Sequence, residues 1–319
     1  MSGKLYATMA LTIILLFGIL FAILVAVGMY FSVSSMFMVP LMIVIIVVQW
    51  AASPKLVWAM TGLRLLEKDE LNWLRESIAQ ICKKNNVRVP RIAISKTDQP
   101  NAFVFGRTSR SATLAVTQGL LDTLTKDEVK AVVGHEIGHI KHNDMVVMTV
   151  ASAVPMITYY IGISLMFSGD SRRGDAAIFG IIAFAVYFLS NLLVMSLSRL
   201  REYHSDEFGG RVTKPGDLAS ALAKITYGLA KSRSKNKNNA VRSFYIADPI
   251  NSAAEISQFS DAYADRYISK EEVRDAMAAE RSSGSMKFLE IFRTHPLTVK
   301  RIEALHKLDD KINEEGVKI

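Results

Sequence analysis

TKDEVKAVVGHEIGHIKHN, residues 125–143, is the stretch that decides the fold of this chain. Thr125 and Glu128 stand three positions apart at its start, which is the spacing of a capping box, where hydroxyl and carboxylate each accept a hydrogen bond from a backbone N–H. Apolar residues follow at helical spacing. The stretch therefore predicts a helix that begins at Thr125.

Three residues in the middle of this helix form the pattern H-E-x-x-H. Because residues four apart share a helix face, His135 and His139 can bind a single zinc ion. Glu136 is rotated by about 100° from His135 and is expected beside the metal, where a general base belongs. The same pattern also occurs by chance on solvated helix faces. A third ligand is therefore needed before the motif indicates a site.

The chain has 319 residues, of which 50% are hydrophobic, a high share for a soluble protein. No Asp, Glu, Lys or Arg lies between Lys4 and Lys55, and one membrane span takes about 20 apolar residues. We therefore predict two spans, Leu5–Phe31 and Met36–Ala52. A cleaved signal peptide is the alternative for residues 1–31, but this apolar stretch is longer than an h-region of about 7–15 residues.

Two further charge-free runs, Met145–Phe167 and Ala176–Ser196, flank the hydrophilic turn at residues 168–175. Each run is long enough to cross a bilayer with some tilt or thinning. A buried helical hairpin inside the enzyme domain is the alternative. No charged residue lies inside any of the four predicted spans, which argues against a proton- or ion-coupled transporter.

The formal net charge of +8 lies almost wholly outside these spans, in Pro54–Asp144 and Arg199–Ile319. By the positive-inside rule both segments belong in the cytoplasm, which predicts a multi-pass protein of the cell membrane. The basic character indicates contact with the lipid bilayer, and no nucleic-acid-binding signature accompanies it. Cys82 is the only cysteine, so no intrachain disulfide forms, which fits a reducing compartment.

The segment before the active helix predicts one helix and a small sheet. Leu65–Asn86 has an apolar face at helical spacing. Three strands are expected after it: Arg91–Ser95, Ala102–Gly106 and Thr113–Thr117. An edge strand beside a zinc site can pair with an extended substrate backbone, which makes candidate substrate-binding residues of Asn101, Ala102 and Phe103. An ordinary strand of a small core is the alternative.

His142 and Glu202 are the first candidates for a third ligand. His142 lies seven residues from His135, a rise of about 10 Å along a helix, so one ion cannot reach both, and no glycine breaks the helix between His139 and His142. His142 is expected to cap the helix or to meet lipid headgroups.

Glu202 and Asp206 are four residues apart and share a helix face, while His204 lies almost opposite Glu202. One carboxylate can bind zinc, while the other accepts a hydrogen bond from the ring N–H of a histidine ligand that does not face the metal. Two histidines and one glutamate leave a fourth position open for water, as hydrolysis requires. The alternative is a charged helix end at the membrane surface, with solvated side chains at Arg199, Arg201 and Glu202.

Four motifs in order resemble the HtpX-type membrane metalloproteases, which are similar more distantly to the CAAX prenyl proteases. They are PNAF at 100–103, HEIGHIKH at 135–142, SR-x-x-EY-x-x-D at Ser198–Asp206, and THP followed by RI at 294–302. The resemblance runs from about residue 1 to about residue 305. His204 departs from it, since alanine or glutamate is commoner there.

The resemblance implies one zinc ion per chain, bound by His135, His139 and Glu202, with Glu136 as the base. It also implies endoproteolysis of unfolded or membrane proteins in quality control. It further implies that His295, with Arg301 nearby, reaches the cleft from the C-terminal region. Zinc would then polarise the scissile carbonyl, and His295 would stabilise the oxyanion.

The expected fold is mainly α with a small β-sheet, a zincin-like catalytic domain with transmembrane helices. It is divided into an N-terminal hairpin (1–53), a first catalytic part (54–144), a second hairpin (145–197) and a second catalytic part (198–319). A CAAX-type prenyl-protein protease is an alternative, although that architecture has more than four spans. An intramembrane site-two protease is disfavoured, because Lys130 and Lys141 flank the motif.

A membrane zinc sensor or scaffold without turnover is the alternative from a different class. Its purely structural site has no use for Glu136, an unligated carboxylate beside the metal. The presence of this glutamate therefore favours an enzyme.

Overall fold

The computed structural model describes residues 35–166, 175–231, 270–282 and 284–316, and scattered positions between residues 7 and 23. Most of the expected first span, Leu5–Phe31, and the turn at residues 168–174 lie outside the described residues. The chain forms two compact units, which are described separately. One comprises Met1–Ser53 and Val146–Leu200, and the other comprises Pro54–Met145 and Arg201–Ile319.

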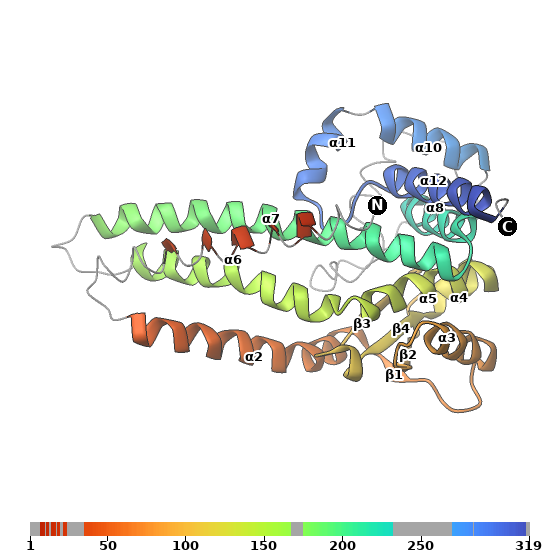
Figure 1. Cartoon of the computed structure of the whole chain (residues 1–319), viewed down its shortest axis with the longest axis horizontal. Coiled ribbons are helices and arrows are strands. Elements are labelled where there is room, and N and C mark those ends of the chain that lie inside the picture. Colours follow the sequence, from red (N-terminus) through yellow and green to blue (C-terminus); the bar gives the residue numbers. More distant parts are fainter. Residues whose placement is uncertain are drawn as a thin grey trace. The chain divides into compact units, whose positions relative to one another are not determined.

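Long apolar helices form the first unit (Figure 1). They are contained in α2 (Ser35–Thr61), α6 (Asp144–Met166) and α7 (Asp175–Val212). By length and composition, Asp144–Ile163 and Ile178–Val212 are candidate membrane spans among the described residues. α2 includes the predicted span Met36–Ala52, and α7 includes the run Ala176–Ser196. α6 contains the run Met145–Phe167 as far as Met166, and Phe167 lies outside the described residues.

Aromatic contacts join α6 to α7 within this unit. The ring of Tyr159 lies 5.8 Å from that of Phe184 and 5.3 Å from that of Tyr187. Several large apolar side chains of α7 instead point outward: Ile178, Ile181, Ile182, Phe188 and Leu189. Outward apolar side chains on a long apolar helix are what a lipid environment favours.

A four-stranded sheet forms one layer of the second unit. Its strands are β1 (Arg64–Leu65), β2 (Arg91–Ser95), β3 (Ala102–Phe105) and β4 (Thr113–Thr117), in the order β1-β2-β4-β3. β2 and β4 are parallel, whereas β3 is antiparallel to β4. All three predicted strands are therefore present, and β3 is an edge strand as predicted. The short 3-10 helix η1 (Ser109–Ser111) precedes β4.

The helix predicted over Leu65–Asn86 begins later than expected. Helix α3 spans Asn72–Lys84, and Leu65 instead pairs with Ala93 of β2. Leu71 has a φ of 50°, a left-handed conformation that interrupts a right-handed helix. The apolar spacing predicted the helix correctly, but the predicted start was seven residues too early, 72 − 65, because β1 depends on a partner distant in sequence.

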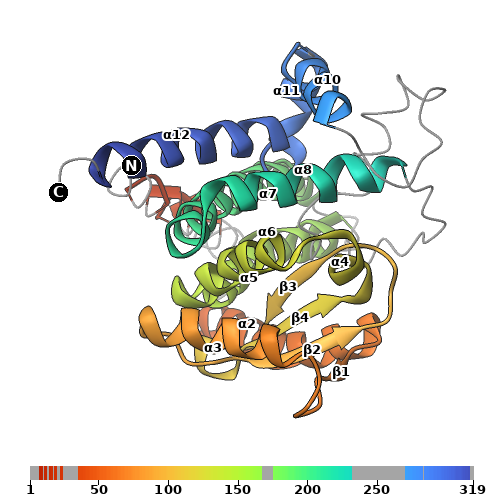
Figure 2. The same cartoon turned by 90° about the vertical axis from the view of Figure 1, so that its right-hand side faces the viewer.

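The predicted active helix is α5 (Lys126–Lys141), and it lies between the sheet and α8 (Pro215–Lys231) (Figure 2). The capping box is confirmed, since Glu128 Oε2 accepts from Thr125 N at 2.8 Å and Thr125 Oγ1 accepts from Glu128 N at 3.3 Å. The short helix α4 (Gln118–Thr123) precedes α5. The core around α5 contains Leu74, Ile78, Leu114, Val116, Val133, Ile137 and Leu222.

The C-terminal part adds α10 (Lys270–Ser282), α11 (Gly284–Leu289), the 3-10 helix η4 (Glu290–Phe292) and α12 (Thr298–Gly316). Helix α12 packs against α8 and buries Ile302, Leu305 and Leu308 in the core. Two carboxylates cap α12. Glu280 accepts from the N–H groups of Thr298 and Val299 at 3.0 and 3.2 Å, and Glu290 accepts from that of Leu297 at 3.2 Å.

Candidate active site

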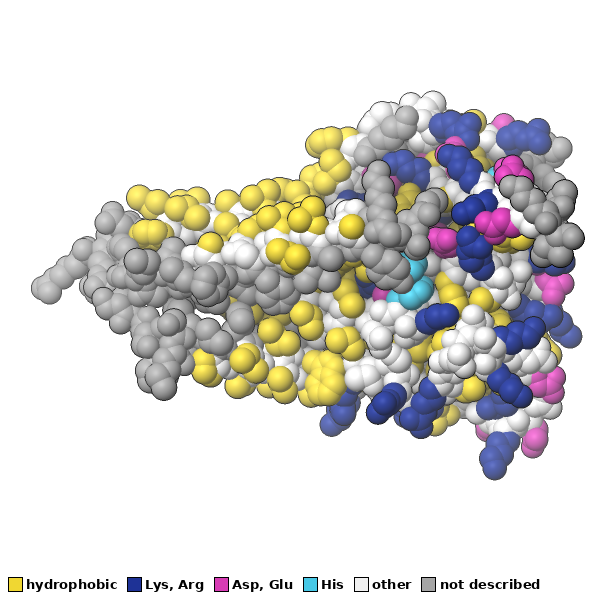
Figure 3. All heavy atoms as spheres, in the orientation of Figure 1, with side chains coloured by type: hydrophobic (Ala, Val, Ile, Leu, Met, Phe, Trp, Pro, Cys, Tyr) yellow, Lys and Arg dark blue, Asp and Glu magenta, His cyan; other side chains and the backbone are white. Residues whose placement is uncertain are grey.

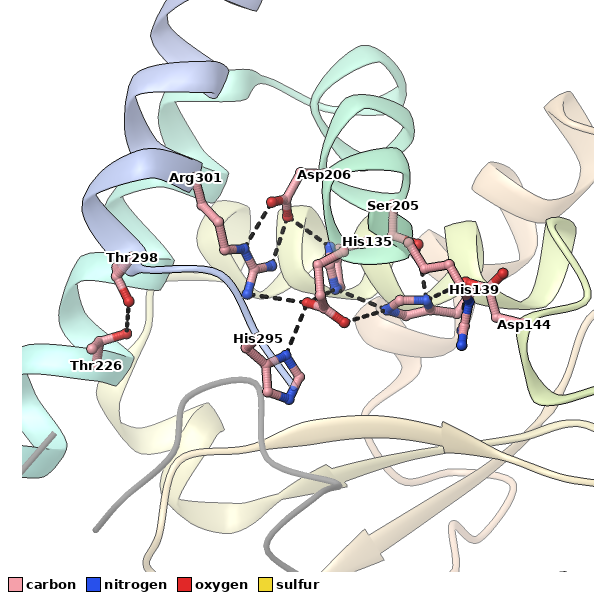
Figure 4. Close-up of polar contacts among 11 residues, drawn as sticks. His135, His139, Asp144, Ser205, Asp206, Thr226, His295, Thr298 and Arg301 are labelled. Carbon is pink, nitrogen blue, oxygen red and sulfur yellow. Dashed lines mark hydrogen bonds and ion pairs between the residues drawn. The ribbon is translucent and has the colours of Figure 1, made fainter. Parts of the chain in front are cut away.

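The two histidines of α5 turn one nitrogen each toward a common point (Figure 4). His135 Nε2 lies 3.1 Å from His139 Nε2, and the two rings are nearly perpendicular at 89°. Both residues and Glu136 offer ligand atoms within 4.8 Å of one another. The motif is buried, so it does not lie on a solvated helix face.

Glu202 of α7 supplies a carboxylate to the same point. Its Oε1 lies 3.4 Å from His139 Nε2, and its Oε2 lies 3.6 Å from His135 Nε2. In a tetrahedral zinc site with Zn–N bonds of 2.0–2.1 Å, neighbouring ligand atoms are about 3.3 Å apart. The nitrogen–nitrogen separation of 3.1 Å and the separations of 3.4 and 3.6 Å, each to a different oxygen of Glu202, are close to this value, so the three side chains fit one shared ion.

Two glycines let α5 and α7 approach closely enough for this arrangement. A Cβ atom on Gly209 of α7 would lie 2.8 Å from the backbone nitrogen of His135. A Cβ atom on Gly138 of α5 would lie 3.2 Å from Ser205 Cα. Any side chain at Gly209 would therefore collide with the backbone of the helix that carries the histidines.

Each histidine has a carboxylate at its other ring nitrogen. Asp206 Oδ1 lies 2.9 Å from His135 Nδ1, and Asp144 Oδ2 lies 2.6 Å from His139 Nδ1. Ser205 Oγ is also within 2.9 Å of His139 Nδ1. These contacts favour a proton on Nδ1, which leaves both Nε2 atoms free to act as ligands.

Asp144 and Arg201 are the site residues that sequence reasoning missed. Asp144 is only 1% exposed and accepts from Arg201 Nη2 at 2.8 Å. Arg201 and Glu202 are 7% and 6% exposed, so the alternative that these side chains are solvated is wrong. The only signal in the sequence was Asn143, which has a φ of 57° and separates α5 from α6. A residue tolerant of the left-handed region there allowed the chain to return Asp144 to His139.

Arg301 and His295 both contact Glu202 from the C-terminal region. Arg301 Nη1 and His295 Nδ1 lie 3.1 and 3.2 Å from Glu202 Oε2. Arg301 also donates from Nε and Nη2 to the two oxygens of Asp206. Figure 4 shows His295 on the segment before α12, pointing toward the histidine cluster. The structure therefore brings all six of these residues together: His135, His139, Glu202, Asp206, His295 and Arg301.

The protonation of α5 residues reflects their burial. Burial raises the pKa of Glu136 to about 8, and its carboxylate accepts a hydrogen bond from the N–H of Val104. Burial lowers the pKa of His135. Burial also acts to lower the pKa of His139, but hydrogen bonds to Asp144 and Glu202 outweigh it and raise this pKa to about 10. With this pKa, the ring of His139 carries a second proton, on Nε2, at neutral pH. A cation bound at Nε2 must displace this second proton, and it would also lower the pKa of Glu136.

Every second residue of the edge strand β3 directs its backbone N–H and C=O away from β4, and one of these residues, Val104, contacts Glu136. Thr117 N donates to Asn101 O at 3.0 Å, so Asn101 directs its backbone groups to β4. Because pairing alternates along antiparallel strands, Phe103 also faces β4, whereas Ala102 and Val104 face the free edge. The side chain of Phe103 is buried, with its ring centroid 5.9 Å from that of Phe105.

His142 and His204 form a separate pair. His142 is the C-cap of α5, and its ring stacks on that of His204 with centroids 3.6 Å apart. Neither belongs to a group of metal-ligand residues among the described residues. The expectation that His142 caps the helix is confirmed.

A buried H-E-x-x-H helix beside an edge strand, with a carboxylate from a second helix, defines a zincin-like metallopeptidase. The model of peptidase family M48 matches residues 68–309. The chain therefore belongs to peptidase family M48, and it is a membrane metalloprotease.

Curated relatives agree over most of the chain. The chain is 32% identical over 302 residues to a protease HtpX homolog of Thermoplasma acidophilum, covering 92% of each chain. It is 39% identical over 232 residues to a protease HtpX homolog of Methanothermobacter thermautotrophicus, covering 71% of this chain and 88% of the relative. The HtpX resemblance predicted from the motifs is thus confirmed.

A crystal structure of Ste24p from S. mikatae has a similar fold, with a TM-score of 0.51 and 16% identity. The match covers 95% of this chain and 66% of that one. At this identity the likeness shows the fold alone, and it agrees with the predicted zincin-like helical fold.

Proposed function

We propose that this protein is a zinc endopeptidase in which His135, His139 and Glu202 hold one zinc ion per chain. The observation that carries the proposal is the convergence of two imidazole nitrogens, 3.1 Å apart, with the Glu202 carboxylate, whose Oε1 lies 3.4 Å from His139 Nε2 and whose Oε2 lies 3.6 Å from His135 Nε2. Two imidazoles and one carboxylate are a ligand set of catalytic zinc sites. Asp206 orients the ring of His135, and Asp144 orients the ring of His139.

When bound, zinc supplies a Lewis acid for the scissile carbonyl and the attacking water. Glu136 takes the proton of this water and delivers it to the leaving amine, because its carboxylate lies beside the ligands and is buried. His295 donates a hydrogen bond to the oxyanion. Arg301 neutralises Asp206 and fixes the Glu202 oxygen that it contacts.

Substrate binding is proposed along β3, with Asn101, Ala102 and Phe103 at the start of the strand. The backbone N–H and C=O of Ala102 and the C=O of Val104 face away from β4, where an extended peptide can pair with them independently of its sequence, whereas the Val104 N–H already donates to Glu136. Glu136 contacts the same edge through Val104 N–H. A peptide on this edge therefore passes beside the proposed base, and Phe103 supports the strand from the core.

A protease that recognises backbone groups suits unfolded polypeptides and membrane proteins, and we propose quality control at the cell membrane as its role. The net charge of +8 outside the apolar runs supports several spans and a cytoplasmic active site. Impermeant labelling of Lys83→Cys and Arg172→Cys in intact cells tests the orientation. Labelling of both from the same side contradicts it.

The test of the chemistry is Glu136→Gln in the detergent-purified full chain. This change removes the base and leaves the three ligands, so zinc by mass spectrometry stays at one per chain while casein cleavage is lost. Glu76→Gln on the exposed face of α3 is the matched control and keeps both. Loss of zinc together with activity would place Glu136 among the ligands, and full activity would show that another group is the base. Zinc binding without casein cleavage by the parent chain would favour the zinc scaffold.

A further inference from the structure

The segment α11–η4 exposes its apolar residues and buries its acidic one. Phe288, Leu289, Ile291 and Phe292 are 62%, 49%, 42% and 41% exposed, whereas Glu290 between them is 9% exposed. In water, a short helical segment normally turns its apolar side chains inward. Figure 3 shows hydrophobic side chains gathered over α11.

Specific contacts of Glu290 fix this orientation. Its Oε1 accepts from Leu297 N at 3.2 Å, and its Oε2 contacts the ammonium group of Lys300. The rings of Phe288 and Phe292 lie 6.0 Å apart and form one outward surface. Rotating the segment to bury these rings would break the cap that Glu290 provides to α12. The outward apolar face is therefore built into the fold.

The charges around this face favour a membrane surface over water. Residues 281–293 contain three basic residues, Arg281, Lys287 and Arg293, of which Arg281 pairs with Glu303, and one acidic residue, Glu290, which is buried. Large apolar side chains flanked by basic residues are typical of segments that lie in the interface of an anionic bilayer.

We propose that α11–η4, Gly284–Phe292, is a bilayer-docking element whose four exposed apolar side chains enter the anionic surface of the membrane. Removing four large apolar side chains from water together favours insertion into the bilayer. A membrane protein keeps lipid at a high effective concentration, which favours the bilayer over a soluble partner. Glu290 joins this element to the start of α12, a few residues after His295.

Spin labelling of the full chain in nanodiscs tests the proposal. Phe288→Cys and Phe292→Cys are made separately in the Glu136→Gln background, so that the result does not depend on activity. Cys82 is buried and its thiol pKa is raised to about 11, so labelling is confined to the introduced cysteine. Lys307→Cys, on the exposed side of α12, is the control.

In nanodiscs of phosphatidylcholine and phosphatidylglycerol, labels at 288 and 292 are expected to be relaxed by oxygen, which concentrates in lipid, more than by an aqueous nickel chelate. The label at 307 is expected to show the opposite order. The proposal is overturned if the labels at 288 and 292 behave like the control. It is also overturned if both reagents are excluded, since the face would then be covered by a second copy or by a polypeptide.

Discussion

The guanidinium group of Arg301 holds Asp206 with two hydrogen bonds, of 2.8 Å from Nε to Oδ2 and 2.7 Å from Nη2 to Oδ1. Its third nitrogen lies 3.1 Å from Glu202, and Asp206 in turn contacts His135 at 2.9 Å. Arg301 and Asp206 are each 2% exposed. One buried cation therefore connects α12 with Glu202 and Asp206 of α7 and, through Asp206, with a histidine of α5.

Arg301→Gln should destabilise the catalytic unit strongly. Removing one partner of a buried ion pair costs about 3–5 kcal/mol, because the remaining charge stays buried without compensation. Chemical unfolding of the full chain in detergent measures the change. Arg64→Gln is the control, since Arg64 and its partner Glu70 have side chains 42% and 31% exposed, and such surface pairs contribute little to stability. Equal losses in the two variants would contradict this account.

Gly209→Ala should separate α7 from α5. The new Cβ would meet the backbone nitrogen of His135 at 2.8 Å, a contact that no side-chain rotation relieves. Overpacking of this kind costs about 1–3 kcal/mol, and it also displaces Glu202 from the histidines. We expect reduced zinc content together with a lower unfolding midpoint.

Gly216→Ala is the matched control for this variant. No atom lies within 4 Å of a Cβ built at Gly216, which is in the first turn of α8. Alanine is a better helix former than glycine by about 1 kcal/mol, so this variant should bind zinc normally and be as stable or more stable. Normal zinc binding in Gly209→Ala would show that the close approach of the helices does not position the site.

Asp144→Ala should weaken zinc binding without removing a proposed ligand. Loss of a carboxylate that orients a histidine ligand typically lowers metal affinity by about 10–100-fold. Competition with a zinc chelator measures the affinity. Asp127→Ala is the control, because that side chain is 71% exposed and pairs only with Lys130 at 3.0 Å among the described contacts. An unchanged affinity in Asp144→Ala would mean that Ser205 alone orients His139.

Local sequence signals predicted much of the second unit. The capping box at Thr125 and the strands β2, β3 and β4 were found because each depends on residues close together in the chain. The two-residue strand β1 was missed, because its existence depends on pairing with Ala93 and Ile94. Spacing cannot reveal such a partner.

The sequence predicted those site residues that share one face of a helix. The four-residue spacing of Glu202 and Asp206 indicated that both face one way, and the family resemblance added His295 and Arg301. Asp144 was missed because its approach to His139 requires the left-handed conformation of Asn143 between two helices. Its ion pair with Arg201 likewise joins residues 57 positions apart, 201 − 144, and no sequence period connects them.

Glu202→Gln should abolish zinc binding and proteolysis while leaving most of the fold intact. Glutamine has nearly the same size, but it is neutral and a poor zinc ligand, so only two imidazoles would remain. Arg301 keeps its two hydrogen bonds to Asp206, so the variant should unfold closer to the parent than Arg301→Gln does.

Glu207→Gln on the same helix is the matched control for Glu202→Gln. Glu207 pairs with Arg211 at 3.3 Å on a partly exposed face, and this variant should keep both zinc and activity. Zinc content and casein cleavage measured on the same preparations separate the outcomes. If Glu202→Gln still holds one zinc per chain and cleaves casein, the third ligand lies elsewhere. Asp206 would then be the next residue to test, because its carboxylate already contacts His135.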